Sequence, residues 1–384
     1  MEANYSLSRH QNTGHGHATI PFGTLSESRN TFVFEVLYPV PSDQHSEHSS
    51  KMPGYGQFLR GQIQTPPMPQ VNLTGRTILI TGANSGLGLD AAKLLVQLKC
   101  STIILVCRTI AKGEQAKKVV QSASSAGGHL PQIILLELDL GSFSSVAAFA
   151  ERCKDLPRLD AAILNAGVQP SEFSLTEGYE TTITVNVIST FLLATLLVPV
   201  LRQSAIKYNI TPTIAITGSA VHFWANDKDL TTPPDGQILK TLSDPKKTDM
   251  KVRYFLSKLP VMLLVKHFAN MLTASAERDP IGKPLVVTNN VAPGFCYTNL
   301  FRDQGAAYNA VIKRVARSSE HGARTLVHGG TAGKETHGQY LSECKVKPYS
   351  PFVKSKEGDK TAQRLWDELS AIYEGVKPGC TKEL

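Results

Sequence analysis

From Asn72 onward, short apolar runs alternate along the chain with amphipathic segments of helical length. The short runs are apolar throughout, which is typical of strands buried on both faces of a parallel sheet. Helical connections between such strands form right-handed crossovers and cover both sides of the sheet. The sequence therefore predicts an α/β fold with a doubly wound parallel sheet. The predicted strands are Thr77–Thr81, Thr102–Cys107, Ile133–Leu138, Ala161–Leu164, Thr213–Thr217, Leu285–Asn290 and a closing strand within Gly338–Ser342.

The two ends of the chain differ in composition from this periodic part. Residues 1–70 are rich in Ser, His, Pro and Gly, which predicts an extension of low order. Within it, residues 56–69 are expected to pack as an arm against the domain. A single domain is then expected over residues 71–345. Residues 346–384 are expected to form a polar C-terminal tail around one helix, Lys360–Tyr373.

Composition disfavours several classes of protein. The longest apolar stretches fall short of the roughly 20 residues that span a bilayer, and residues 1–30 do not resemble a secretory signal. The net charge of +8 comes from scattered Lys and Arg residues, which is typical of a solvated surface. The six cysteines are widely spaced, without a Cys-x-x-Cys pair. We therefore expect an intracellular, cytoplasmic protein with free thiols and no metal, transmembrane segment or nucleic-acid partner.

The first predicted strand leads into a glycine-rich turn, Thr81–Gly88, which is followed by an apolar-periodic helix at Ala91–Leu98. Glycines in such a turn let the backbone approach a pyrophosphate, and the helix amino terminus supplies free N–H groups and the positive end of its dipole. A glycine triplet alone would be weak support, but this one lies between a strand and a helix of a repeating βα pattern. It predicts a Rossmann-type dinucleotide site. The candidate cofactor-binding residues of the turn are Gly82, Ser85, Gly86, Leu87 and Gly88.

The end of the second strand discriminates between NAD and NADP, because an acidic side chain there repels a 2′-phosphate whereas an arginine accepts it. The chain has Arg108 at this place, and Lys112 follows one helical turn later. A guanidinium can hold a phosphate through two parallel hydrogen bonds. The pattern favours NADP, and the alternative is that Arg108 is an ordinary surface residue.

Two further strand ends are expected at the cofactor. After the third strand, the carboxylate of Asp139 can accept a hydrogen bond from the adenine amine; alternatively, Asp139 caps the next helix, Ser142–Ala150. After the fourth strand, small residues let the backbone approach the cofactor. The candidates at these two places are Asp139, Leu140, Asn165, Ala166 and Gly167.

Tyr254 and Lys258 stand four residues apart, which places them on one face of a helix. The ammonium can then lower the pKa of the phenol, so Tyr254 is a candidate general acid for carbonyl reduction and general base for alcohol oxidation. Ser219, after the fifth strand, can donate a hydrogen bond to the substrate oxygen. Singly, Tyr254 could be a plain helix residue, Ser219 a plain turn residue and Asn186 a buried polar group satisfied by the backbone. Pro260 is awkward deep inside a helix, so we expect the helix to begin close to Lys258, which weakens the argument from spacing.

These motifs occur in the order found in the classical short-chain dehydrogenases/reductases, and residues 72–341 resemble that superfamily. The resemblance implies an enzyme that interconverts a ketone or aldehyde and an alcohol with NADP or, less favoured here, NAD. The matching motifs are TGxxxGxG at Thr81–Gly88, NAG at Asn165–Gly167, Asn186 in the next helix, Ser219, YxxxK at Tyr254 and Lys258, and PGxxxT ending at Thr298.

The resemblance also assigns roles to single residues. It implies that Lys258 hydrogen-bonds the nicotinamide ribose, that Asn186 holds a water linking Lys258 to solvent, and that Thr298 lies over the nicotinamide amide. It implies a substrate-covering segment at Asn299–Ile312. Because many relatives pair through the helices that hold Asn186 and Tyr254, a homo-oligomer is one expectation.

The chain departs from the family in two places. More residues than usual separate Ser219 from Tyr254, which indicates an insertion at about 224–252, and Gly218 stands where a second Ser is frequent, which we expect to matter little. The segment Phe58–Pro67 resembles fungal reductases of secondary metabolism, in a branch that includes retinol-dehydrogenase-like proteins. This implies a small polyketide- or terpenoid-type substrate. Apolar residues compatible with such a ligand are Phe223, Trp224, Phe295, Tyr297 and Phe301.

Two other functions remain open at this point. A catalytically silent dinucleotide-binding regulatory protein would keep the fold without the chemistry, and the presence of Ser219, Tyr254 and Lys258 disfavours it. A sugar-nucleotide epimerase uses a similar Tyr and Lys, but its glycine motif is spaced differently and its C-terminal domain is larger. The sequence does not indicate the substrate, the stereochemistry or the direction of hydride transfer.

Overall fold

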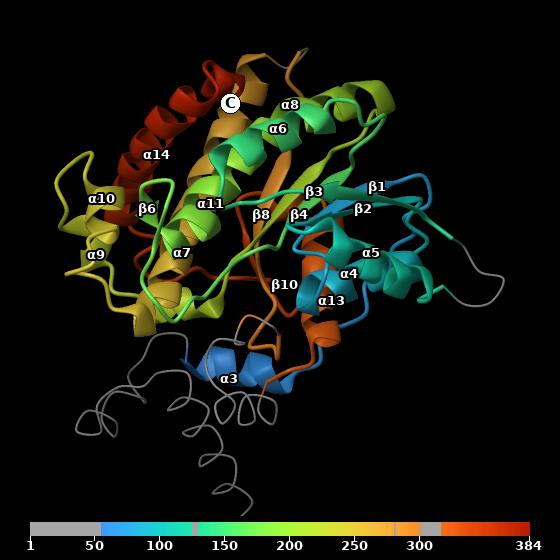
Figure 1. The fold of residues 1–384 in the computed structure, drawn as a ribbon, viewed down its shortest axis with the longest axis horizontal. Coiled ribbons are helices and arrows are strands. Elements are labelled where there is room, and N and C mark those ends of the chain that lie inside the picture. The colour runs from blue at the N-terminus through green and yellow to red at the C-terminus, as the bar shows by residue number, and fades with distance from the viewer. Residues whose placement is uncertain (1–54, 125–129, 280–281, 299, 301–315) are drawn as a thin grey trace, which may run out of the picture. The chain divides into compact units, whose positions relative to one another are not determined.

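A computed structural model of the protein describes residues 55–124, 130–279, 282–298, 300 and 316–384. Their eight-stranded sheet has the order β10-β9-β8-β7-β4-β1-β2-β3 (Figure 1). All strands run parallel except β10, which forms an antiparallel pair with β9. The doubly wound parallel sheet is thus confirmed. The strands are β1 Thr77–Thr81, β2 Thr102–Cys107, β3 Gln132–Glu137, β4 Ala161–Leu164, β7 Thr213–Thr217, β8 Val287–Ala292, β9 Tyr340–Ser342 and β10 Lys345–Lys347, beside a small hairpin of β5 Leu175–Thr176 and β6 Tyr179–Glu180.

The strand bounds follow the sequence closely in the middle of the sheet. β1, β2, β4 and β7 begin and end where predicted, and β3 is displaced by one residue. β8 lies two residues further along the chain than predicted and continues to Ala292. It ends before Pro293, whose nitrogen has no hydrogen to donate to a neighbouring strand.

Helices cover both faces of the sheet (Figure 1). Two separate apolar clusters, one on each face, form the core. The first face carries α4 Gly86–Gln97, α5 Ile110–Gln121 and α13 Ser319–Thr331; the second carries α6 Phe143–Cys153, α7 Thr181–Ile183, a π-helical segment Thr184–Ser189, α8 Thr190–Tyr208, α11 Met250–Arg278 and α14 Lys356–Val376.

Two helices of the second face are long and apolar enough to cross a membrane by length and composition. They are Thr181–Tyr208 and Met250–Arg278, so the expectation that no apolar segment reaches this length is wrong. However, 94% and 61% of their 18-residue apolar windows are buried inside the protein. Helices that are apolar on all sides also occur in the cores of globular proteins. Both of these helices pack on the sheet as core helices do.

Pro260 lies inside α11, contrary to the expectation that this helix begins near Lys258. The helix begins at Met250, where the carboxylate of Asp249 accepts a hydrogen bond of 2.9 Å from the backbone of Lys251. Residues on both sides of the proline are buried in the core. Burial of this length of helix outweighs the roughly 3 kcal/mol that an interior proline costs.

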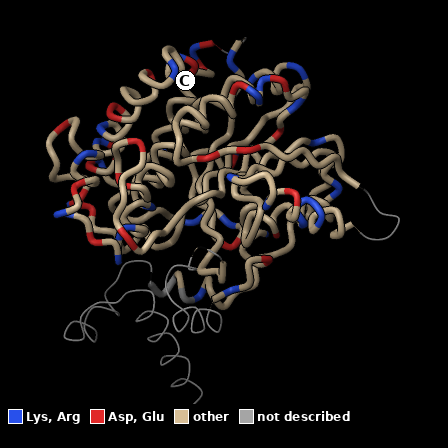
Figure 2. The backbone as a smooth tube through the Cα atoms, viewed as in Figure 1, with Lys and Arg blue, Asp and Glu red and all other residues tan. Residues whose placement is uncertain are grey.

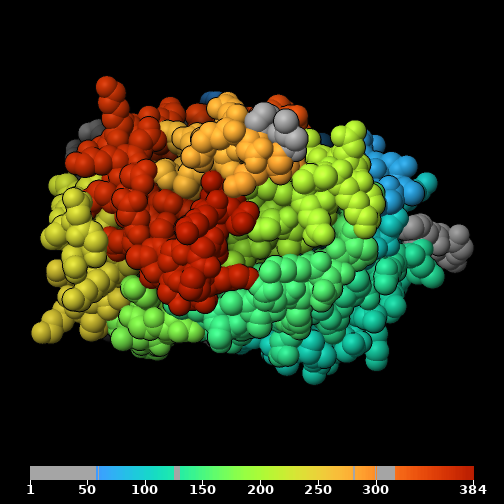
Figure 3. Space-filling view, turned by 90° about the horizontal axis from the view of Figure 1, so that it is seen from above, coloured from blue at the N-terminus to red at the C-terminus, as the bar shows by residue number. Residues whose placement is uncertain are grey.

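The C-terminal segment is part of the core rather than a polar tail. β10 extends the sheet, and α14 packs on α11, where the rings of Trp366 and Phe268 lie 5.9 Å apart. The hydroxyl of Tyr373 donates 2.9 Å to the carbonyl of Ile188, and Arg202 of α8 donates to the carbonyl of Glu383. In Figure 3 the red C-terminal segment lies across the helices of this face.

The segment between Ser219 and Tyr254 folds against the same C-terminal helix. It contains a 3-10 turn Ala220–Trp224, α9 Lys228–Thr231 and α10 Ile238–Leu242. The carboxylate of Glu368 in α14 accepts hydrogen bonds from the backbone of Ile238 at 2.7 Å and Leu239 at 2.9 Å, which caps α10. In Figure 3 this segment, in yellow, adjoins the red C-terminal helix.

Candidate active site

The ends of β1 and β4 are joined by hydrogen bonds. The hydroxyl of Thr81 accepts from the backbone of Asn165 and of Ala166, each at 3.0 Å, and the Asn165 amide donates 3.1 Å to the carbonyl of Thr81. The strand order reverses between β1 and β4, and ligands of open α/β sheets bind outside the carboxyl ends of strands at such a point. The glycine turn and the Asn165–Gly167 segment are therefore held at the place where a dinucleotide is expected.

The glycine turn is too tight for side chains at its key positions. Gly82 and Gly86 have positive φ angles of +68° and +52°, and a Cβ on Gly88 would lie 2.4 Å from the carbonyl oxygen of Gly82. A Cβ on Gly86 would lie 3.3 Å from Cβ of Thr298, so the later loop covers this turn. The turn thus leaves a cradle of bare backbone at the amino end of α4, suited to a pyrophosphate.

The side chains of two other residues of the turn form no contact that points to a cofactor. Ser85 is the N-cap of α4 but forms no side-chain cap hydrogen bond. Leu87 points toward α13, because a Cβ added to Gly322 would lie 2.6 Å from its Cδ2. A cofactor contact at Leu87 would therefore involve its N–H rather than its side chain.

Arg108 and Lys112 are exposed at the carboxyl end of β2 and in the first turn of α5. Among the described residues, neither side chain forms an ion pair or a hydrogen bond. Figure 2 shows Lys and Arg interspersed with Asp and Glu along the chain. Helix α5 also carries Lys117 and Lys118. Both side chains are thus available to an anion at this strand end.

Asp139 stabilises its own turn rather than the next helix. Its carboxylate accepts 2.8 Å from the backbone of Gly141, and the N-cap of α6 is Ser142, which accepts 3.3 Å from Ser145. The alternative that Asp139 is a helix cap is wrong. Leu140 is buried beside it.

Ser219, Tyr254 and Lys258 meet at the carboxyl end of β7. Lys258 donates 2.9 Å to the carbonyl of Thr217, and its Nζ lies 5.4 Å from the centre of the Tyr254 ring. Burial raises the pKa of Tyr254, which a hydrogen bond with Ser219 partly offsets. Burial also lowers the pKa of Lys258 to about 8. The expectation that Lys258 brings the phenol pKa toward neutrality is thus not met in the protein without cofactor; at neutral pH the phenol is protonated, as a proton donor must be.

Asn186 lies in the π-helical segment before α8, and such segments are frequent at functional sites. Its amide oxygen accepts 2.8 Å from the backbone of Val168, and its nitrogen donates to the carbonyl of Val168 at 3.0 Å and to the hydroxyl of Ser257 at 3.2 Å. The side chain therefore ties the segment after β4 to α11.

Gly218 matters more than expected. A Cβ there would lie 2.1 Å from the amide oxygen of Asn290 and 2.5 Å from Cε of Met262. Asn290 is fully buried in β8 and fills the space that a serine side chain would need. A serine at position 218 would therefore require the side chains of Asn290 and Met262 to move.

His222 is a neighbour of Ser219 that sequence reasoning missed. Its Nε2 accepts 3.3 Å from the backbone N–H of Ser350, so its Nδ1 carries the proton and donates 2.7 Å to the carbonyl of Ser219. Burial lowers its pKa to about 4 and keeps it neutral. His222 thus links the candidate catalytic serine to the C-terminal segment, and its partner Ser350 is too distant in sequence to produce a local pattern.

Acid is expected to destabilise the protein through His222. The pKa of His222 is about 6.5 in the unfolded chain and about 4 in the folded chain, so protonation favours the unfolded state. The free energy of unfolding is therefore highest above pH 6.5 and decreases as pH falls toward 4. The expected loss is about 2 kcal/mol between pH 7 and pH 5. Urea unfolding of the unaltered protein and of His222→Asn at pH 7 and pH 5 measures this loss. If both proteins lose the same free energy of unfolding, His222 is not its cause.

The aromatic residues expected near the substrate differ in how far they are buried. Trp224 and Phe295 are buried, Phe223 packs 6.5 Å from the Tyr340 ring, and Tyr297 is 40% exposed. Cys296 is buried, and burial raises the pKa of its thiol to about 12, which suits packing rather than nucleophilic attack. Phe301 and all of Asn299–Ile312 except Leu300 lie outside the described residues.

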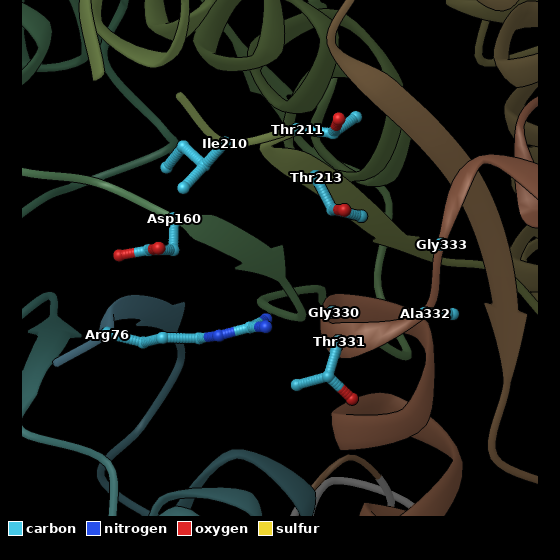
Figure 4. A pocket seen from close by; sticks show the side chains of 9 residues that line it. All are labelled: Arg76, Asp160, Ile210, Thr211, Thr213, Gly330, Thr331, Ala332 and Gly333. Carbon is cyan, nitrogen blue, oxygen red and sulfur yellow. The ribbon is translucent and has the colours of Figure 1, made fainter. Parts of the chain in front are cut away.

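A cavity of about 280 Å³ lies at the opposite edge of the sheet, at the amino ends of β1, β4 and β7 (Figure 4). Arg76 and Asp160 line it together with the carboxyl end of α13. The carboxylate of Asp160 is already bound by Arg158 at 2.7 and 2.8 Å and by the backbone of Thr77. This cavity is therefore separate from the candidate active site.

Comparisons with known proteins agree with this geometry. A family profile described as short chain dehydrogenase matches residues 76–219. The short chain dehydrogenase/reductase dmxR8 of Cryptosporiopsis sp. is 40% identical over 330 residues, which cover 84% of this chain and 98% of that protein. The short-chain dehydrogenase anuD of Penicillium roqueforti is 36% identical over 329 residues, 84% of each chain.

Solved structures share the fold at lower identity. A 3-oxoacyl (acyl-carrier-protein) reductase from Agrobacterium tumefaciens, with NADP bound, has a TM-score of 0.52 at 17% identity and covers 70% of this chain and 93% of that one. A short-chain type dehydrogenase/reductase from Mycobacterium marinum has a TM-score of 0.51 at 18% identity, over 70% and 94%. The chain therefore belongs to the short-chain dehydrogenase/reductase family of oxidoreductases, which act on alcohol and carbonyl groups.

Proposed function

We propose that the protein interconverts a ketone or aldehyde and an alcohol on a small, largely apolar molecule, with NADP as cofactor. The observation that carries the proposal is the meeting of Ser219, Tyr254 and Lys258 beside the bare glycine turn at one edge of the sheet. NADP(H) would supply or accept the hydride when bound. The aromatic side chains near Ser219 and in the loop after β8, together with the similarity to fungal relatives, support an apolar substrate of secondary metabolism.

In the proposed reduction each side chain has a distinct task. Ser219 donates a hydrogen bond to the carbonyl oxygen, and Tyr254 transfers its phenolic proton to the developing alkoxide. Lys258 stabilises the phenolate that remains, and the nearby positive charge favours this step. Asn186 positions α11 through Ser257.

The adenosine half of the cofactor would lie along the other strand ends. Arg108 and Lys112 would bind the 2′-phosphate, and Asp139 with Leu140 would face the adenine. Asn165, Ala166 and Gly167 would let the backbone approach the cofactor; a Cβ on Gly167 would lie 3.1 Å from the Asn186 amide oxygen, so this segment has no room for a larger residue there. Thr298, which covers Gly86, would contact the nicotinamide half.

The cofactor preference is tested by calorimetric titration of NADPH and NADH into the protein and into Arg108→Ala. Loss of a charged bidentate contact is expected to raise the Kd for NADPH by roughly 10- to 100-fold and to leave the Kd for NADH unchanged. Arg278→Ala, an exposed arginine of α11, is the matched control. If the unaltered protein binds NADPH and NADH with equal affinity, the proposed preference for NADP is wrong.

A further inference from the structure

The segment before the Rossmann domain contacts the loop that carries Thr298. It begins with α3, Tyr55–Ile63, and continues past Pro66. Residues 56–69, expected from the sequence to form an arm, lie in this segment and are called the arm. The arm precedes the residues matched by the family profile. In Figure 1 α3 lies at the edge of the sheet where the strands end. The ring of Phe58 in α3 packs edge-on against the ring of Trp224, in the turn that follows Ser219, with 5.3 Å between the ring centres.

Gln62 forms a paired contact with one residue of this loop. Its amide nitrogen donates 2.7 Å to the carbonyl of Phe295, and its amide oxygen accepts 3.0 Å from the N–H of the same residue. The side chain thus satisfies both backbone groups of Phe295, as a neighbouring strand would. A single side chain fixes both the position and the orientation of this peptide.

Arg317 joins the arm to the same loop from the other side. The residue is 6% exposed, and its guanidinium donates to the carbonyl of Pro293 at 3.0 Å, to that of Gln64 at 3.0 Å and to that of Gly61. Its backbone N–H also donates 2.8 Å to the carbonyl of Phe295. A buried arginine that gives its hydrogen bonds to carbonyls of two separate segments holds those segments together.

The loop has little freedom to move away from these contacts. Gly294 has φ +83°, and a Cβ there would lie 2.6 Å from Nη1 of Arg317. The loop then passes Cys296, which lies near enough to Tyr254 to raise its pKa, and reaches Thr298 over Gly86. A shift of Phe295 is therefore transmitted to the residues proposed to meet the nicotinamide.

We propose that Gln62 and Arg317 are positioning residues that hold the Pro293–Thr298 loop in place for the nicotinamide half of the cofactor, so that the arm is a required part of the active site. The inference rests on the proposed function. Neither side chain touches the reacting atoms; both act through the backbone of Phe295 and Pro293.

The test uses the full chain and two ligands. In Gln62→Leu the Kd for NADP⁺ by calorimetry is expected to rise roughly tenfold at pH 8, because two hydrogen bonds to Phe295 are lost. The Kd for 2′,5′-ADP, which contains only the adenosine half, is expected to stay unchanged. Gln70→Leu, an exposed glutamine after the arm, is the matched control for both ligands.

Gln62→Glu separates positioning from general destabilisation. An ionised carboxylate repels the carbonyl of Phe295, whereas a protonated one donates to it and still accepts from its N–H, as the amide does. The Kd for NADP⁺ relative to the unaltered protein is expected to be about tenfold higher at pH 8 and to fall to roughly fourfold higher at pH 5, because a carboxyl with an ordinary pKa of about 4.3 is then partly protonated. This readout also decides the matter if Gln62→Leu does not fold.

The outcomes distinguish this inference from the function on which it rests. If the unaltered protein binds neither NADP⁺ nor NAD⁺, the proposed function fails and the inference with it. If the unaltered protein binds NADP⁺ while both Gln62 variants bind it as tightly as Gln70→Leu does, the positioning role is wrong and the function stands. Equal weakening of NADP⁺ and 2′,5′-ADP would also overturn the positioning role, since the defect would not be confined to the nicotinamide half.

Discussion

Tyr254→Phe is expected to lower kcat for carbonyl reduction by roughly three orders of magnitude and to leave the Kd for NADPH within about twofold. The variant removes only the phenolic hydroxyl, while its ring still fills the space beside Lys258 and Phe255. The alkoxide that forms on hydride transfer then lacks a proton donor, because Ser219 can donate a hydrogen bond but is a poor acid. Binding of the cofactor does not require the hydroxyl proton to move.

The measurement is steady-state turnover with the best substrate from a panel of aromatic and aliphatic ketones and aldehydes, beside a direct NADPH titration. Tyr208→Phe is the control, because it removes a hydroxyl that donates 2.9 Å to the carbonyl of Pro157, near the amino ends of the strands and away from the candidate site. If Tyr254→Phe keeps full turnover, another group supplies the proton. If the unaltered protein binds NADPH but reduces no carbonyl compound, the catalytically silent interpretation replaces the enzymatic one.

Gly88→Ala is expected to raise the Kd for NADPH by roughly a hundredfold. The new Cβ would lie 2.4 Å from the carbonyl oxygen of Gly82 and 2.9 Å from the amide nitrogen of Asn165. The carbonyl is backbone and cannot turn aside as a side chain does, so the turn itself must move. Displacement by about 1 Å of groups that position a ligand can cost a hundredfold in function.

Calorimetric titration of NADPH into Gly88→Ala measures this effect, and thermal unfolding establishes that the variant is folded. Gly375→Ala in α14 is the control, since a Cβ there meets no atom within 4 Å and alanine favours a helix. Unchanged affinity in a folded Gly88→Ala protein would show that the dinucleotide does not lie against this turn.

Local sequence patterns were sufficient to predict most strands of the sheet and the glycine turn. β1, β2 and β4 read as largely apolar runs because both of their faces are covered by helices. The turn was recognisable because its glycines are required by contacts within eight residues, such as that between Gly88 and Gly82.

Features that depend on distant contacts could not be read in the same way. Pro260 suggested a helix end, but packing of α11 against the sheet and α14 overrides the local preference. The polar composition of α14 hid one apolar stripe, which includes Leu365 and Leu369. His222 and Gly218 gain their importance from Ser350 and Asn290, which lie far along the chain. None of these partners produces a periodic signal.

The placement of α14 has a consequence for stoichiometry. Helices α8 and α11, through which the resemblance implies pairing, are here contacted by the chain's own C-terminal segment, through Trp366 on α11 and the carbonyl of Glu383 on α8. A second copy could not reach these helices without displacing α14 and exposing its apolar stripe to water. Contact between two chains on this part of the surface would therefore be made by α14 rather than by α8 and α11.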